Sequence, residues 1–70
     1  MKIMTSIGSA IRERRKLLGI NQRTLAELSS IGVNVVTRIE RGESNTSIKI
    51  LEKVLDTLGM ELSATIKNVK

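Results

Sequence analysis

The sequence predicts an all-α fold: a compact domain of four to five helices, followed by a short C-terminal β-strand that pairs across a dimer. The chain has 70 residues, which is room for one small domain. Its apolar residues recur at helical spacing in four successive segments, each ending at a glycine or a short polar turn. Near the C-terminus this spacing gives way to strict alternation of apolar and polar residues, which is typical of a half-buried strand.

The first helix is expected over residues 6–18, after a short flexible arm at residues 1–5. Gly19 then ends this helix as a left-handed C-cap. Asn21 is the expected N-cap of a second helix over residues 22–29. The apolar positions of these two helices are Ile7, Ala10, Ile11, Leu17, Leu18, Leu25, Ala26 and Leu28, and we expect the last three to face inward.

A turn at Ser30 and Ile31 leads to a third helix, which begins at residue 32 or 33 and is stopped by Gly42. Ser47 is the expected N-cap of the fourth helix, which ends at Gly59. The apolar stripe of the fourth helix consists of Ile48, Leu51, Val54, Leu55 and Leu58. The domain organisation predicted from these elements is an arm at residues 1–5, a helical domain at 6–59 and a strand and tail at 60–70.

Positive charge is concentrated in the first third of the chain. Residues 1–23 carry six basic side chains against one acidic, whereas residues 24–70 carry six of each, so the whole net charge of +5 belongs to the first segment. A one-sided basic excess is typical of a surface that binds phosphate groups. A merely soluble basic surface would look the same, and charge alone does not separate the two.

The residue types that are absent exclude several functions. The chain has no Cys and no His, which excludes zinc fingers, thiol nucleophiles and histidine acid–base chemistry. Without Phe, Tyr or Trp there is no platform on which single-stranded nucleic acid could stack. No paired catalytic groups, metal ligands or cofactor motif are found, so we expect neither an enzyme nor a cofactor. No long apolar run or signal peptide is found, which predicts a cytoplasmic, nucleoid-associated protein.

Residues 19–42 contain two short helical patterns separated by a tight break, and this arrangement is typical of the helix-turn-helix, whose second helix enters the major groove of DNA. The segment resembles the lambda-repressor-like (XRE/Cro-type) family of DNA-binding domains. The matching positions are Gln22, Leu25, Ala26, Val36, Ile39, Glu40 and Gly42. Ser30 departs from the family pattern, which usually has a glycine with positive φ at this turn. A serine in that conformation costs about 1 kcal/mol.

The third helix is expected to read bases. Because Val36 and Ile39 are three residues apart and face the core, the opposite face is left for DNA. Arginine pairs with guanine and asparagine with adenine, and valine and threonine methyl groups pack on thymine. The expected base-contacting residues are Val33, Asn34, Thr37, Arg38 and, at the start of the second helix, Gln22. An ordinary solvated helix face remains the alternative.

Helix N-termini and nearby cations are expected to hold the DNA backbone, because their free N–H groups and positive charges attract phosphate. The predicted phosphate-contacting residues are Asn21, Arg23, Arg41, Asn45 and Ser47. Asn21 and Ser47 could equally be simple helix caps, and the two roles are compatible.

Arg15 lies on the inward stripe of the first helix, where a charge needs a partner. The family resemblance implies that this partner is Glu40, in a partly buried structural ion pair. The neighbouring Arg12, Arg14 and Lys16 are expected to stay in solvent, near phosphates at most.

The alternating segment at residues 61–67 needs a partner strand, because a lone strand is unstable in water. Pairing with a second copy would make a two-fold interface, and the expected interface residues are Met60, Leu62, Ala64 and Ile66. A frayed tail is the alternative. Helices followed by such a strand resemble the HipB-type antitoxins, and this resemblance implies autoregulation of an operon and a HipA-type serine/threonine kinase as partner.

The function predicted from these observations is a homodimeric repressor that binds a palindromic operator in double-stranded DNA and serves as the antitoxin of a HipA-type operon. A phage or plasmid repressor without a toxin partner is the alternative within the same class. An adaptor whose helix-turn-helix docks protein instead of DNA is the alternative from another class; its binding to DNA would depend little on salt.

Overall fold

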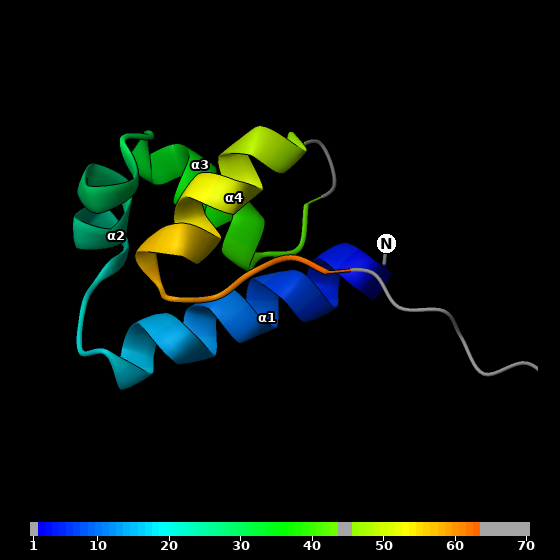
Figure 1. Cartoon of the computed structure of the whole chain (residues 1–70), viewed down its shortest axis with the longest axis horizontal. Helices are drawn as coiled ribbons and strands as arrows, with labels where there is room; N and C mark the ends of the chain where they lie inside the picture. Colours follow the sequence, from blue (N-terminus) through cyan, green and yellow to red (C-terminus); the bar gives the residue numbers. More distant parts are fainter. Residues whose placement is uncertain (1, 44–45, 64–70) are drawn as a thin grey trace, which may run out of the picture.

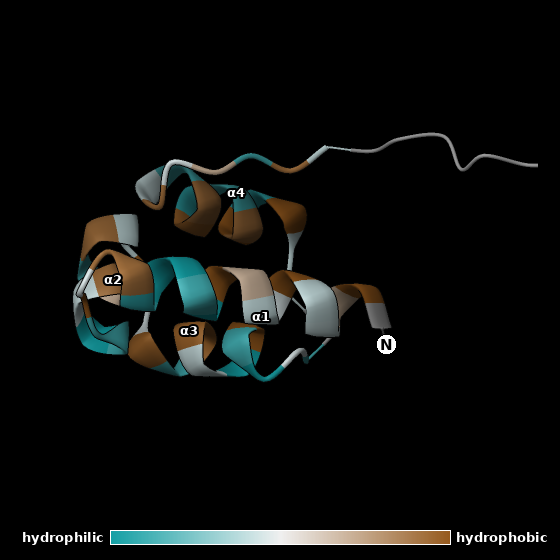
Figure 2. Ribbon diagram, turned by 90° about the horizontal axis from the view of Figure 1, so that it is seen from below, coloured by the Kyte–Doolittle hydropathy of each residue, from teal (hydrophilic) through white to brown (hydrophobic). Residues whose placement is uncertain are grey.

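Four helices make up the part of the chain that the computed structural model describes, residues 2–43 and 46–63 (Figure 1). The helices are α1 (Lys2–Leu17), α2 (Gln22–Ser29), α3 (Val33–Glu40) and α4 (Ile48–Thr57). No strand occurs within the described ranges, so the all-α fold class is confirmed. Figure 2 shows α4 and the segment that follows it on one side of α1, with α3 on the other.

The core is aliphatic and draws on all four helices. Its fully buried large side chains are Ile11, Leu25, Val36, Ile39, Val54 and Leu58. Fewer apolar positions are buried than the helical spacing suggests. The helices are short, so each one covers only part of the apolar stripe of its neighbour. Leu28, which we expected inside, is 63% exposed, and Leu17 in the last turn of α1 is 76% exposed. Ile48 in the first turn of α4 is exposed as well.

The predicted flexible arm at residues 1–5 is wrong for residues 2–5, because α1 already begins at Lys2. The reason is the side chain of Met4, which is buried in the core with 8% exposure. Met4 lies three residues before Ile7 and seven before Ile11, so it extends the inward stripe by one turn.

The first half of α1 lies directly against the end of α3. A Cβ atom on Gly8 would collide with the carbonyl oxygen of Ile39 and lie 3.1 Å from that of Glu40. A Cβ atom on Gly42 would lie 2.8 Å from the Cα of Thr5. Two glycines therefore allow the backbones to approach, and they fix how α3 sits on α1.

The helix ends have the caps that the sequence predicts. The Asn21 side chain accepts a 2.8 Å hydrogen bond from the backbone N–H of Thr24, and the Ser47 hydroxyl accepts one of 3.2 Å from that of Ile50. Gly19 has φ 73°, a left-handed conformation that suits glycine. Ser30 follows α2 with φ 58° and ψ 44°, so the strained turn expected from the missing glycine is present.

Polar bonds join the helices at their ends. Buried Ser29 donates a 2.9 Å hydrogen bond to the hydroxyl of Thr57, which donates to the carbonyl of Lys53. Arg14, which we expected in solvent, is half-buried, and its Nε donates a 2.9 Å bond to the carbonyl of Leu58. Arg14 leaves solvent because the last carbonyls of α4 lack partners within the helix and need a donor.

After α4 the chain turns back along α1 (Figure 1). The N–H of Met60 donates a 2.8 Å bond to the carbonyl of Leu55, and the Met60 side chain packs against the core. Residues 60–63 form no strand. The rest of the predicted strand, including Ala64 and Ile66, lies outside the described residues. Within those residues, no helix is both long enough and apolar enough to cross a membrane.

Candidate nucleic-acid interface

One face of α3 is open to solvent and carries polar side chains. Val36 and Ile39 are fully buried on the other face, as expected from their spacing. Asn34 and Arg38, one helical turn apart, are exposed. Together with Thr37 and Arg41 they line an open hollow of about 400 Å³. Two side chains with the donors that read guanine and adenine edges are therefore accessible on a single helix face.

Val33 and Thr37 are less available than the sequence suggests. The side chain of Val33 is half-buried and packs against the core. The hydroxyl of Thr37 lies 2.9 Å from the Gln22 side-chain oxygen and 3.1 Å from the carbonyl of Val33. A hydroxyl has one proton to donate, so both acceptors compete for it inside the protein.

Gln22, in the first turn of α2, links α2 to α3 instead of projecting freely. Its Oε1 accepts from Thr37, and its Nε2 donates a 3.0 Å hydrogen bond to Oε1 of Glu40. The amide is thereby oriented from both ends, with its oxygen toward the middle of α3 and its nitrogen toward the end of that helix.

The predicted pair of Arg15 and Glu40 is present and has two-point geometry. Nε of Arg15 donates to Oε2 of Glu40 at 2.6 Å, and Nη2 donates to Oε1 at 3.0 Å. The Nη1 atom of Arg15 donates to the carbonyl of Ile20 at 3.0 Å. The two charged side chains are only 10% and 4% exposed. This pair ties α1 to the end of α3 and thus holds the polar face of α3 in place.

Opposing effects act on the carboxyl of Glu40. Burial favours its neutral form, but hydrogen bonds from Arg15 and Gln22 and the charges of Arg15 and Arg12 outweigh this effect. The pKa of Glu40 therefore lies below its ordinary value, and the ion pair is formed at neutral pH.

Four of the five residues predicted to contact phosphate lie in the described part of the chain. Arg23 and Arg41 are exposed, and Arg41 forms only a long, solvent-exposed pair with Glu43 at 3.4 Å. Asn21 and Ser47 act as helix caps, and a phosphate contact at either helix end stays a prediction. Asn45 lies outside the described residues.

Arg12, which we expected in solvent and near phosphates at most, is exposed and belongs to this surface. It lines a second polar hollow of about 250 Å³ together with residues of all three helices that surround it. The sequence feature that indicates this position is its spacing from Arg15. Residues three apart are neighbours on the surface of a helix, so Arg12 lies beside Arg15.

Two short helices joined by a tight turn, with the second exposing a polar face above a buried apolar one, define the helix-turn-helix class of DNA-binding domain. The chain belongs to the helix-turn-helix family, to which its residues 11–64 match. The predicted lambda-repressor-like resemblance is thus confirmed at the level of the family and the fold.

Among relatives, the chain is 39% identical over 56 residues to a Haemophilus influenzae protein described as an uncharacterized HTH-type transcriptional regulator. That match covers 80% of this chain and 57% of the relative, so the chain spans little more than half of that protein.

Two solved structures share the fold. One is the restriction-modification controller protein C.AhdI from Aeromonas hydrophila, with a TM-score of 0.79 and 33% identity over 87% of this chain and 92% of that one. The other is the clp gene regulator ClgR from Corynebacterium glutamicum, with a TM-score of 0.74 and 32% identity over 81% of this chain and 61% of that one.

Proposed function

We propose that this chain is a sequence-specific repressor that binds double-stranded operator DNA through α3. The observation that carries the proposal is the exposed pair Asn34 and Arg38 on a helix whose opposite face is locked into the core. Family membership and the named roles of the relatives as regulators support it. Base reading rests mainly on these two residues, because Val33 packs on the core and Thr37 is engaged with Gln22.

The test is selection of preferred duplexes from a random pool, followed by binding measurements on the selected sequence. Arg38→Ala should lose preference at one base pair, worth about 1–3 kcal/mol of discrimination, while binding to unrelated duplex changes little. Arg23→Gln is the matched control: it should weaken binding to all duplexes alike and leave the sequence preference unchanged. Equal weakening of every duplex by Arg38→Ala would contradict its role in base reading.

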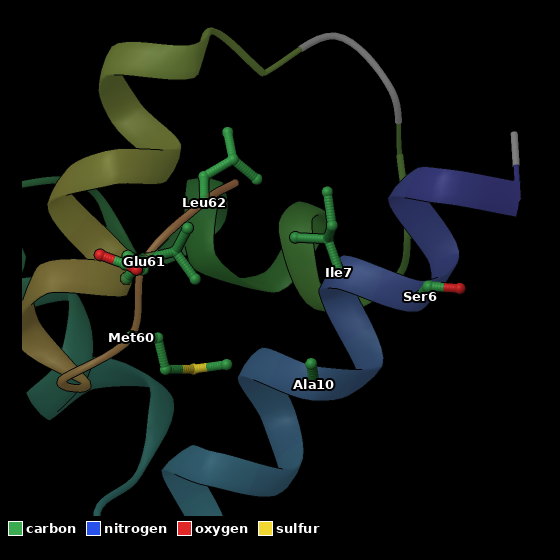
Figure 3. Close-up of a pocket in the computed structure, with 7 residues that line it drawn as sticks. Ser6, Ile7, Ala10, Met60, Glu61 and Leu62 are labelled. Atoms are coloured by element: carbon green, nitrogen blue, oxygen red, sulfur yellow. The ribbon is translucent and has the colours of Figure 1, made fainter. Parts of the chain in front are cut away.

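We further propose that the chain acts as a homodimer, because two recognition helices about 34 Å apart reach successive major-groove turns of a palindrome. An apolar groove of about 220 Å³ supports this proposal; Figure 3 shows Met60 and Leu62 facing Ile7 and Ala10 across it. Leu62 is 41% exposed, and in Figure 2 the chain after α4, which supplies Met60 and Leu62 to the groove, lies on the other side of α1 from α3. A second copy bound in this groove would leave the polar face of α3, with Asn34 and Arg38, open to DNA.

The HipA-type antitoxin role stays a prediction from the C-terminal segment. The relatives reported above are named as a transcriptional regulator, a gene regulator and a restriction-modification controller, so support is stronger for a transcriptional regulator in general. Co-expression with a kinase encoded next to this gene tests the narrower role: co-purification of a stable complex would support it, and free kinase would contradict it.

A further inference from the structure

We propose that the polar hollow among α1, α2 and α3 binds one phosphate group of the DNA backbone, gripped between Arg12 and Arg41. This inference rests on the proposed function and adds a site on α1 to it. The hollow is lined by Arg12, Arg15, Gln22, Thr37, Glu40 and Arg41.

The charges of the hollow favour an anion. Three guanidinium groups and one carboxylate line it, and that carboxylate, Glu40, is already held by Arg15 and Gln22. The remaining two positive charges, Arg12 and Arg41, come from α1 and from the end of α3, so they approach the hollow from different elements.

Both of these arginines can turn toward a ligand. Arg12 is exposed and forms no ion pair with any other described residue. Arg41 is 67% exposed at its side chain, and its 3.4 Å pair with Glu43 is of the solvent-exposed kind that contributes little. An arginine fork matches the oxygens of a phosphate group, with two parallel N–H bonds.

The position of the hollow, next to the side chains expected to contact bases, favours a phosphate of bound DNA over a free anion as its ligand. Thr37 and Arg41 line both this hollow and the one that holds Asn34 and Arg38, so the two hollows share a wall. An anion bound beside Arg12 would therefore lie next to the base-reading side chains. Backbone phosphates border the major groove in the same way, and contacts to them fix the register of a protein on the duplex.

The experiment compares Arg12→Gln with Lys53→Gln, a matched loss of one exposed positive charge on α4 outside both hollows. Binding to the selected duplex and to an unrelated duplex is measured between 50 and 200 mM salt. Loss of one phosphate contact should make the negative slope of log affinity against log salt shallower by about 0.9, which is about a 3.5-fold difference over this range. Lys53→Gln should keep the wild-type slope.

Ethylation interference on the selected duplex supplies an independent readout. One phosphate whose ethylation weakens the wild-type protein should no longer matter to Arg12→Gln, while the preferred base sequence stays the same. An unchanged slope and ethylation pattern in Arg12→Gln would overturn the inference but leave the proposed function standing. Failure of the wild-type chain to bind any duplex would overturn the proposed function, and the phosphate site with it.

Discussion

At the residue scale, the arrangement of the polar face of α3 depends on the carboxylate of Glu40. This side chain receives two hydrogen bonds from Arg15 and one from Gln22, and Gln22 in turn accepts from Thr37. One buried acid thus connects α1, the start of α2 and both turns of α3. Because the pair is largely shielded from water, removal of one partner leaves the other charge without compensation.

Replacement of Glu40 by Gln should therefore lower the free energy of unfolding by about 3–5 kcal/mol, since the buried guanidinium of Arg15 loses its counter-charge. Urea unfolding followed by circular dichroism measures this loss. Glu43→Gln is the matched control, because it breaks only the exposed pair with Arg41 and should cost less than about 1 kcal/mol. Equal losses in the two variants would argue against a structural role for the buried pair.

The lowered pKa of Glu40 also predicts how stability depends on pH. The folded pKa lies below the unfolded value of about 4.3, so the unfolded chain binds the proton more readily. The contribution of Glu40 is then fully present above that value and is lost as pH falls through the folded pKa. The stability difference between wild type and Glu40→Gln should therefore shrink below about pH 4. A constant difference down to low pH would exclude this linkage.

At the element scale, the crossing of α1 and α3 depends on the absence of a side chain at Gly8. Intrinsic helix propensity favours alanine over glycine inside a helix by about 1 kcal/mol. Packing has the opposite effect, because a Cβ atom there would collide with the backbone carbonyl of Ile39. A backbone atom cannot move aside as a flexible side chain can, so packing should outweigh propensity.

Gly8→Ala should accordingly destabilise the domain by about 1–3 kcal/mol, the usual cost of overpacking, and weaken binding to DNA by shifting α3. Thermal unfolding and duplex binding measure the two effects. In Gly32→Ala a new Cβ atom meets nothing within 4 Å, so stability should change by less than about 1 kcal/mol. Stabilisation by Gly8→Ala would show that helix propensity dominates and that α3 is free to shift.

At the scale of the whole molecule, the segment after α4 lies along α1 and leaves an apolar groove beside it (Figure 3). Met60 already contributes to the core of its own chain, so it serves folding as well as the proposed interface. The dimer proposal therefore depends most on the residues beyond Met60, of which Leu62 is exposed.

A chain that ends at Glu61 tests this proposal, because it keeps the core contact of Met60 and removes Leu62 and the alternating residues after it. It should sediment as a folded monomer and bind a palindromic duplex much more weakly than the full chain. In the full chain, Ile66→Ser should act in the same direction, whereas Lys67→Ser, one position further along the alternation, should stay dimeric. A dimer formed by the truncated chain would place the interface elsewhere.

Local sequence patterns predicted four to five helices, of which the described residues contain four in the expected order, and the caps at Asn21 and Ser47; the left-handed turn at Ser30 came from the family resemblance. These features depend on residues within a few positions of one another, and helical spacing makes such neighbours visible in the sequence. Resemblance to the family added the pair of Arg15 and Glu40, whose members are 25 positions apart.

Tertiary packing sets which side chains share a hollow and which apolar positions are covered. In the structure α1 begins at Lys2, and Thr37 is hydrogen-bonded to Gln22. Arg14 is bonded to the end of α4, and Arg12 and Arg41 line the same hollow. Such contacts join residues far apart in the chain, and they depend on the angle and depth at which the helices cross. Backbone approach at glycines and side-chain volume in the core set that geometry, and neither is visible in periodicity alone.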